Sequence, residues 1–195
     1  MGKRILILQG HPDSRRSHFC HALAAAYAEG ASAAGHEVRT VDIARLKFPL
    51  LRSAAQFERG RPPRDIVAAQ KAVRWSQHLV LVFPLWLGTM PAGVKAFFEQ
   101  AFRPGFALDL GAQARFPRRL LAGRSARVVV TMGMPGLLYR WYFRAHGVRG
   151  LERSILEFSG FKPVRDTLVG LVGAPDAGRR KRWLAQMRKL GRQAA

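Results

Sequence analysis

A loop rich in hydrogen-bond donors follows the first aliphatic run of the chain. It reads Gly10-His11-Pro12-Asp13-Ser14-Arg15-Arg16-Ser17-His18, and the segment after it is typical of a helix. Backbone N–H groups at a helix N-terminus lack partners and the helix dipole is positive there, so a phosphate group is favoured. No G-x-G-x-x-G and no Walker lysine occur, which argues against a Rossmann or P-loop site. The alternative is an ordinary solvated turn with capping serines.

A second loop presents apolar side chains between two prolines. It reads Phe83-Pro84-Leu85-Trp86-Leu87-Gly88-Thr89-Met90-Pro91-Ala92. A flat aromatic cofactor needs apolar faces and backbone groups directed at its heteroatoms, and a rigid loop of this kind can supply both. The alternative is a hydrophobic turn packed into the core.

The elements around these loops alternate between strand and helix five times. Short aliphatic runs predict strands over 3–9, 37–42, 78–83, 127–132 and 164–172. Helical patterns lie at 17–34, with Ser17 as N-cap and Gly35 as C-cap, and at 65–75, 92–102, 151–158 and 176–190. This order predicts an α/β fold with a five-stranded parallel sheet and helices on both faces.

In such a sheet, ligands bind beyond the carboxyl ends of the strands. The loops expected to matter are therefore 10–17, 84–91 and 133–147. The segment from 103 to 124 is the only long connection, and connections of this length are often functional.

Size and cysteine content indicate one domain in a reducing setting. The chain has 195 residues, of which 48% are hydrophobic, and we expect a single domain over residues 1–195. Cys20 is the only cysteine, so an internal disulfide is excluded and a cytoplasmic location is the simplest reading. Neither a signal peptide nor an apolar stretch of about 18 residues is recognised.

The charge is strongly positive, because 33 Lys and Arg residues oppose 12 Asp and Glu, a net charge of +21. Such an excess favours nucleic acid, anionic lipid or phosphorylated cofactors, although Arg-rich composition alone is an equal explanation. No nucleic-acid-binding motif occurs, so nucleic acid is an unlikely partner. The last helix carries Arg179-Arg180-Lys181-Arg182 beside an apolar stripe of Trp183, Met187 and Leu190. This pattern predicts a core-docked helix with a solvated basic face, and peripheral contact with an anionic membrane is the alternative.

The motifs together resemble the NAD(P)H:quinone oxidoreductase family of flavodoxin-like proteins, which includes DT-diaphorase and the ancillary flavoproteins of potassium-efflux systems. The resemblance covers roughly residues 3–172 and rests on His11-Pro12, Ser17, His21-Ala22-Leu23, Phe83-Pro84-Leu85-Trp86, Met90-Pro91-Ala92, Lys95 and Gly105-Phe106-Ala107. It implies a flavodoxin-like fold, FMN or FAD as cofactor, NAD(P)H as co-substrate and a homodimer with its site at the subunit interface. No metal is expected.

The resemblance also implies roles for particular residues. The flavin phosphate would be bound by the first loop, namely by His11, Ser17, His18, Phe19 and Cys20. The isoalloxazine ring would be lined by Pro84, Leu85, Trp86 and Leu87, and its pyrimidine end contacted by Gly133. Tyr139 and His146 are similar to a Tyr and His that lie over the flavin, with a spacing one residue longer here. Cys20 replaces a usual Asn, and Leu87-Gly88 replaces bulky aromatics, which predicts a reshaped acceptor pocket.

Two further properties of Tyr139 and His146 bear on their roles. Tyr139 could donate a hydrogen bond, or the run Leu137 to Phe143 could simply begin a packed helix. His146 could steady developing negative charge, since histidine titrates near neutral pH, or could be an exposed bystander.

The function predicted is two-electron transfer from NAD(P)H to a quinone or similar acceptor. The alternative is a flavin-binding regulatory subunit of a membrane potassium-efflux system. A one-electron flavodoxin is disfavoured because proteins of that class are typically acidic.

Overall fold

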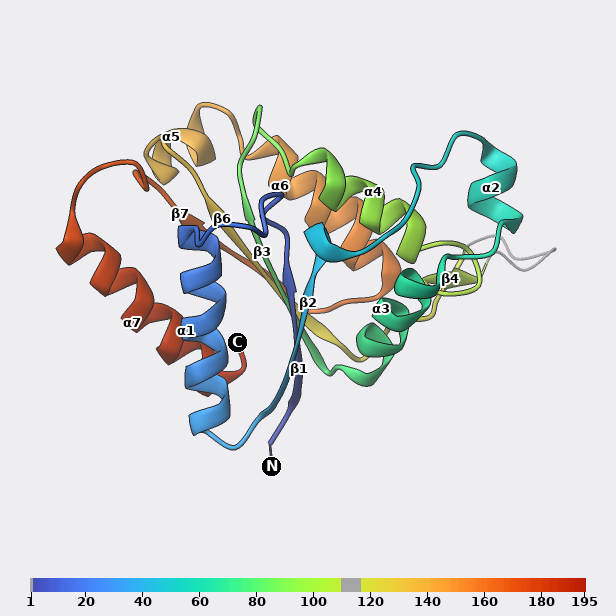
Figure 1. The fold of residues 1–195 in the computed structure, drawn as a ribbon, viewed down its shortest axis with the longest axis horizontal. Coiled ribbons are helices and arrows are strands. Elements are labelled where there is room, and N and C mark those ends of the chain that lie inside the picture. The colour runs from blue at the N-terminus through green and yellow to red at the C-terminus, as the bar shows by residue number, and fades with distance from the viewer. Residues whose placement is uncertain (1, 110–116) are drawn as a thin grey trace.

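The computed structural model describes residues 2–109 and 117–195, so 110–116, within the long connection, lie outside the described residues. Five parallel strands form one sheet in the order β2-β1-β3-β6-β7 (Figure 1). The strands are β1 (Arg4–Gln9), β2 (Glu37–Asp42), β3 (His78–Pro84), β6 (Ser125–Thr131) and β7 (Val164–Val169). The predicted five-stranded parallel sheet is confirmed.

Helices cover both faces of the sheet (Figure 1). One face carries α1 (Phe19–Ala33) and α7 (Ala177–Gln193). The other carries α3 (Arg64–Trp75), α4 (Ala92–Ala101) and the continuous segment of α6 (His146–Gly150) and a π-helix (Leu151–Glu157). The residues of β1 alternate between the two cores, because Ile5 and Ile7 pack with α1 and α7 whereas Leu6 and Leu8 pack on the opposite side.

Several short elements were not predicted. They are a 3-10 turn (Ile43–Arg45), α2 (Ala54–Arg59), the two-residue strands β4 (Leu108–Asp109) and β5 (Arg118–Arg119), and α6. α5 (Gly136–Trp141) lies where a helix was one of two interpretations of the run Leu137 to Phe143. The antiparallel pair β4–β5 lies within the long connection.

Several predicted boundaries were wrong by one to three residues. The N-cap of α1 is His18 rather than Ser17, because the His18 N–H donates to Nδ1 of His21 at 3.1 Å. The C-cap is Ala34, and Gly35 follows it with φ of 77°. β7 ends at Val169, and α7 begins after Asp176, whose side chain caps it.

The packing of α1 against α7 relies on two glycines. A Cβ atom at Gly30 would lie 2.1 Å from the carbonyl oxygen of Arg188, and one at Gly191 would lie 2.1 Å from that of Tyr27. The stripe of α7 is docked as predicted, with Met187 buried and Trp183 and Leu190 packed against the same core. Among the described helices, none is long and apolar enough to cross a membrane.

Candidate functional site

The first loop is held by a cluster of histidines around Asp13. The rings of His11 and His18 stack with centroids 3.8 Å apart. Nε2 of His18 lies 3.0 Å from a carboxylate oxygen of Asp13, and the Asp13 N–H donates to Nδ1 of His11 at 3.1 Å. Burial, and then the neighbouring His18, lowers the pKa of His11, whereas the hydrogen bond with His18 lowers the pKa of Asp13. The loop is therefore ordered by its own side chains.

The first loop also carries hydrogen-bond donors that are exposed to solvent. Arg15, Arg16 and Ser17 are exposed, immediately before His18, the N-cap of α1. The Arg15 N–H donates to Asp13 at 2.8 Å, but its guanidinium group has no ion pair within the described residues. Two cationic side chains and one hydroxyl are thus presented beside a helix N-terminus, where an anionic group is stabilised.

Phe19 and Cys20 differ in how they could contribute. The Phe19 ring is half-buried, with the Arg180 guanidinium 5.4 Å from its centre. The Cys20 side chain is buried, and its Sγ lies 3.1 Å from Oγ1 of Thr131 at the end of β6. Burial raises the pKa of the Cys20 thiol to about 11. Any contribution of Cys20 to ligand binding therefore comes from its backbone.

The second loop is a tight turn that carries its apolar side chains outward. The Leu85 N–H donates to the Thr131 carbonyl at 2.7 Å, and Trp86 and Thr89 exchange two hydrogen bonds of 2.9 and 3.0 Å. Leu87 and Gly88 have φ of 47° and 79°, in the left-handed region. Pro84 and Leu85 are half-buried, whereas Trp86 is 52% exposed and Leu87 is fully exposed. The turn is thus not packed into the core.

The third segment, residues 133–147, is hydrogen-bonded to the second loop. Tyr139 is buried, and its hydroxyl donates to the Gly88 carbonyl at 2.8 Å while accepting the Val148 N–H at 3.4 Å. Burial raises the pKa of Tyr139, so the hydroxyl stays protonated. A Cβ atom at Gly147 would lie 2.2 Å from the Gly88 carbonyl oxygen. The backbones of the two segments are therefore in direct contact.

The remaining candidates of the third segment are accessible. Gly133 is exposed where the chain leaves β6, and His146 is exposed at the start of α6. Tyr139 lies within α5 and donates a hydrogen bond, as one interpretation of its role predicted, whereas most of the run Leu137 to Phe143 is exposed rather than packed. The Tyr139 hydroxyl is engaged by the protein backbone, whereas the His146 side chain is open to solvent.

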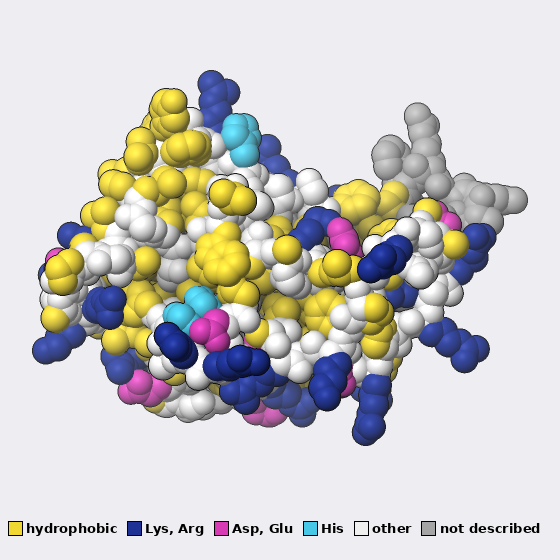
Figure 2. All heavy atoms as spheres, turned by 45° about the horizontal axis from the view of Figure 1, so that its top comes forward, with side chains coloured by type: hydrophobic (Ala, Val, Ile, Leu, Met, Phe, Trp, Pro, Cys, Tyr) yellow, Lys and Arg dark blue, Asp and Glu magenta, His cyan; other side chains and the backbone are white. Residues whose placement is uncertain are grey.

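Large apolar side chains surround the second and third segments. Figure 2 shows hydrophobic side chains gathered over this end of the molecule, with Lys and Arg side chains beside them. We call the exposed members of this group the apolar rim, which comprises Trp86, Leu87, Leu137, Leu138, Trp141, Tyr142 and Phe143. Sequence reasoning missed this surface, although the run Leu137 to Phe143 contains only one charged residue.

The three segments follow β1, β3 and β6, which are neighbours in the sheet. The strand order changes direction at β1, so the first two segments flank the point where ligands bind in open α/β sheets. Cationic and hydroxyl donors lie on the first segment and apolar side chains on the second. These groups fit a cofactor with a phosphate at one end and a flat ring at the other.

A family model described as the flavodoxin-like fold matches residues 3–190. The chain belongs to this family. Among curated relatives of this flavodoxin-like chain, the NAD(P)H dehydrogenase [quinone] 1 of Rattus norvegicus is 26% identical over 205 residues, covering 90% of this chain and 72% of the relative. A ribosyldihydronicotinamide dehydrogenase-like protein of Penicillium crustosum is 24% identical over 192 residues. This match covers 82% of this chain and 70% of the relative.

A solved structure supports the same architecture for this flavodoxin-like chain. The NAD(P)H:quinone oxidoreductase from Methanothermobacter marburgensis superposes with a TM-score of 0.83 at 24% identity, covering 99% of this chain and 97% of that one. The predicted flavodoxin-like fold is therefore confirmed.

Proposed function

We propose that this protein is a flavin-dependent NAD(P)H oxidoreductase that transfers two electrons to a quinone or similar acceptor. The observation that carries the proposal is the meeting of a donor-rich loop and an apolar turn at the carboxyl ends of β1 and β3. The relatives named NAD(P)H dehydrogenase [quinone] support an enzyme of the quinone-type oxidoreductase class. No observation favours the potassium-efflux alternative.

The cofactor proposed is FMN or FAD, held in one flavodoxin-like domain over residues 1–195. A bound flavin supplies the hydride acceptor for NAD(P)H and the two-electron donor for the second substrate. His11, Ser17, His18 and the N–H groups of Phe19 and Cys20 would hold its phosphate. Pro84, Leu85, Trp86, Leu87 and Gly133 would line its ring.

Tyr139 and His146 take different parts in this proposal. Tyr139 fixes the Gly88 carbonyl and thereby positions the turn that lines the ring. His146 is the accessible member of the pair, so it would stabilise negative charge that develops next to the ring.

The apolar rim supports a homodimer. Exposed apolar patches of large side chains mark interaction surfaces, and this patch adjoins the proposed site. A second copy would cover the rim and exclude water from the flavin. A cytoplasmic location with a solvated basic face on α7 completes the proposal, and contact of that face with an anionic membrane is the alternative.

The direct test is the absorption spectrum of purified protein, followed by mass analysis of the released cofactor. We expect yellow protein, or near-stoichiometric binding of added FMN or FAD, and NAD(P)H consumption with a soluble quinone. Colourless protein that quenches no flavin fluorescence at micromolar concentration would contradict the proposal.

Ser17→Asp is expected to weaken flavin binding at least about tenfold, because it places a negative charge beside the proposed phosphate. The measurement is titration of flavin fluorescence. An Asn side chain has nearly the same shape as Asp but no charge. Ser17→Asn should therefore bind flavin with an affinity close to that of the parent. Equal affinities for the Asp and Asn variants would place the phosphate elsewhere.

His146→Ala is expected to lower quinone turnover about 10- to 100-fold, the scale for losing one polar catalytic contact. Since His146 is exposed, flavin content and melting temperature should barely change. Steady-state kinetics on flavin-saturated protein gives the readout. A loss of turnover that only tracks the loss of flavin would make His146 a structural residue.

A further inference from the structure

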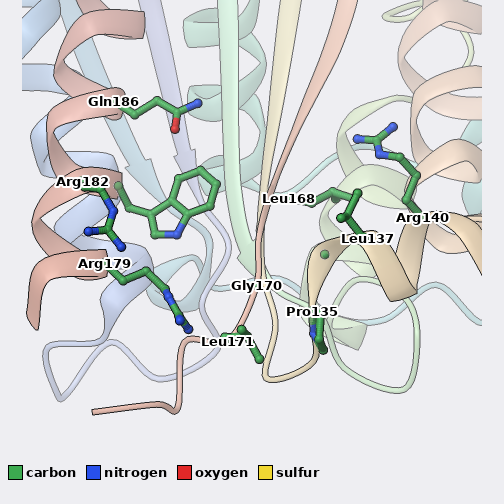
Figure 3. A pocket seen from close by; sticks show the side chains of 11 residues that line it. Pro135, Leu137, Arg140, Leu168, Gly170, Leu171, Arg179, Arg182 and Gln186 are labelled. Carbon is green, nitrogen blue, oxygen red and sulfur yellow. The ribbon is translucent and has the colours of Figure 1, made fainter. Parts of the chain in front are cut away.

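A cavity beside α2 lies apart from the candidate site. It has a volume of about 340 Å³, within the usual range for small-molecule sites. We call it the α2 cavity, and it is lined by residues of the segment 49–63 on one side and by Gln100 and Arg103 on the other. The larger groove of about 600 Å³ between α5 and α7 (Figure 3) adjoins the third segment, whereas α2 lies on the opposite side of the molecule from α7 (Figure 1).

Two buried polar side chains build the inner wall of the α2 cavity. Gln100 is 1% exposed, and its Nε2 donates to the Pro49 carbonyl at 2.7 Å. Arg103 is 5% exposed, and its Nη1 donates to the carbonyls of Gly60 at 2.7 Å and of Gln56 at 3.0 Å. Nη2 of Arg103 donates to Oε1 of Gln100. These bonds hold the segment around α2 against the end of α4, so they fix the position of the guanidinium group.

The positive charge of Arg103 has no negative partner. Its three hydrogen bonds go to uncharged oxygen atoms, and its Nε is buried with no partner among the described residues. Burial lowers the pKa of this guanidinium group, and no carboxylate counters that effect within the part of the chain that the structure describes. A buried charge without a partner costs free energy, which an anion in the cavity would offset.

Two further guanidinium groups line the same cavity. Arg52 and Arg61 are exposed, and neither makes an ion pair within residues 2–109 and 117–195. None of the described residues that line the cavity is acidic. Three cationic side chains therefore surround one hollow, and guanidinium groups bind phosphate oxygens through paired, charge-assisted hydrogen bonds.

We propose that the α2 cavity binds a phosphate dianion, either free or as a small phosphate monoester. Arg103 supplies fixed donors at the inner wall, and Arg52 and Arg61 supply further positive charge on the solvent side. Leu50 and Leu51 give the cavity an apolar wall against which an organic substituent could pack. None of the described lining residues belongs to the three segments of the candidate site, so this inference does not rest on the proposed function.

Calorimetric titration with inorganic phosphate, phenyl phosphate and benzoate distinguishes the sources. The protein is saturated with flavin, which keeps the probes away from the first loop. Tighter binding of phenyl phosphate supports a phosphorylated small molecule, and equal binding of the two phosphates supports free phosphate. Failure of both phosphates to bind, or benzoate binding as tightly as phenyl phosphate, overturns the proposal.

Arg61→Gln locates the binding, with Arg59→Gln as its matched control. Arg59 is exposed at the end of α2 and does not line the cavity, so its replacement makes the same charge change outside the site. We expect Arg61→Gln to weaken phosphate binding at least about fivefold, as for a lost hydrogen bond to a charged group, and Arg59→Gln to have less than about a twofold effect. Equal effects of both variants overturn the proposal, because they would reflect only the general charge. This comparison holds whether or not the protein binds flavin.

The inner wall is tested by Arg103→Met and by the spectrum of the parent protein. Met keeps an unbranched side chain without charge or N–H donors, so this variant should no longer bind phosphate. Because the variant also loses the bonds to Gln56 and Gly60, circular dichroism checks its fold. In the parent, the Nε–H resonance of Arg103, assigned by through-bond correlation, should shift downfield when phenyl phosphate is added. A resonance that stays in place at saturating phenyl phosphate overturns the proposal even if the variant does not fold.

Discussion

Gly147→Ala is expected to lower quinone turnover at least about 100-fold. The added methyl group would lie 2.2 Å from the Gly88 carbonyl oxygen and 2.8 Å from the Cα of Thr89, both backbone atoms of the second loop. The third segment must therefore move away from this loop, and a displacement of about 1 Å in a site can cost about 100-fold in rate. Steady-state turnover with a soluble quinone, at saturating flavin, is the measurement.

Gly150→Ala is the matched control for this prediction. Gly150 lies in the same short helix, and a Cβ atom there would have no heavy atom within 4 Å. This variant should keep its turnover within about twofold of the parent, because Ala is favoured over Gly in a helix. If both variants retain full activity, contact between the two segments is not required for function.

Gly191→Ala is expected to lower the free energy of unfolding by about 3 kcal/mol, at the upper end of the usual cost of overpacking. Its methyl group would lie 2.1 Å from the carbonyl oxygen of Tyr27 and 2.9 Å from the nitrogen of Ala31. Both are backbone atoms of α1, so the two helices would have to separate. Chemical denaturation monitored by circular dichroism measures the change.

Gly93→Ala makes the same chemical change in a helix with free space. Gly93 is exposed in α4, and no heavy atom lies within 4 Å of a Cβ placed there. This variant should raise the free energy of unfolding by about 0.5–1 kcal/mol. Similar losses for both variants would mean that the close contact of α1 and α7 does not set the stability.

The sequence predicted the elements whose patterns are local and left out those that depend on distant partners. The aliphatic run of β1 is buried on both faces, so its composition alone identifies it. In contrast, β4 and β5 are two residues long and exist only because they pair with each other. The cap of α1 was misplaced because His18 and His21 act as a capping pair, which residue preferences for Ser do not reveal.

The candidate site was predicted in position but not in side-chain detail. Strand order places the three loops together, and this follows from the sequence pattern. The engagement of the Tyr139 hydroxyl by Gly88 and the burial of Cys20 against Thr131 depend on contacts across more than 50 residues of chain. The groove of about 600 Å³ between α5 and α7 was not predicted, because Arg140 and Arg182 line it from opposite sides only once the two helices flank the same strand.

The reliance of α1 on α7 also bears on how the chain folds during synthesis. All five strands of the sheet precede α7 in the chain, so their residues are synthesised before those of α7. Until then, Tyr27 and the other core residues on this face lack one of their two covering helices. Domains generally fold as units, and surfaces exposed in the interval are prone to aggregation. A nascent chain therefore exposes part of this apolar face until α7 has docked.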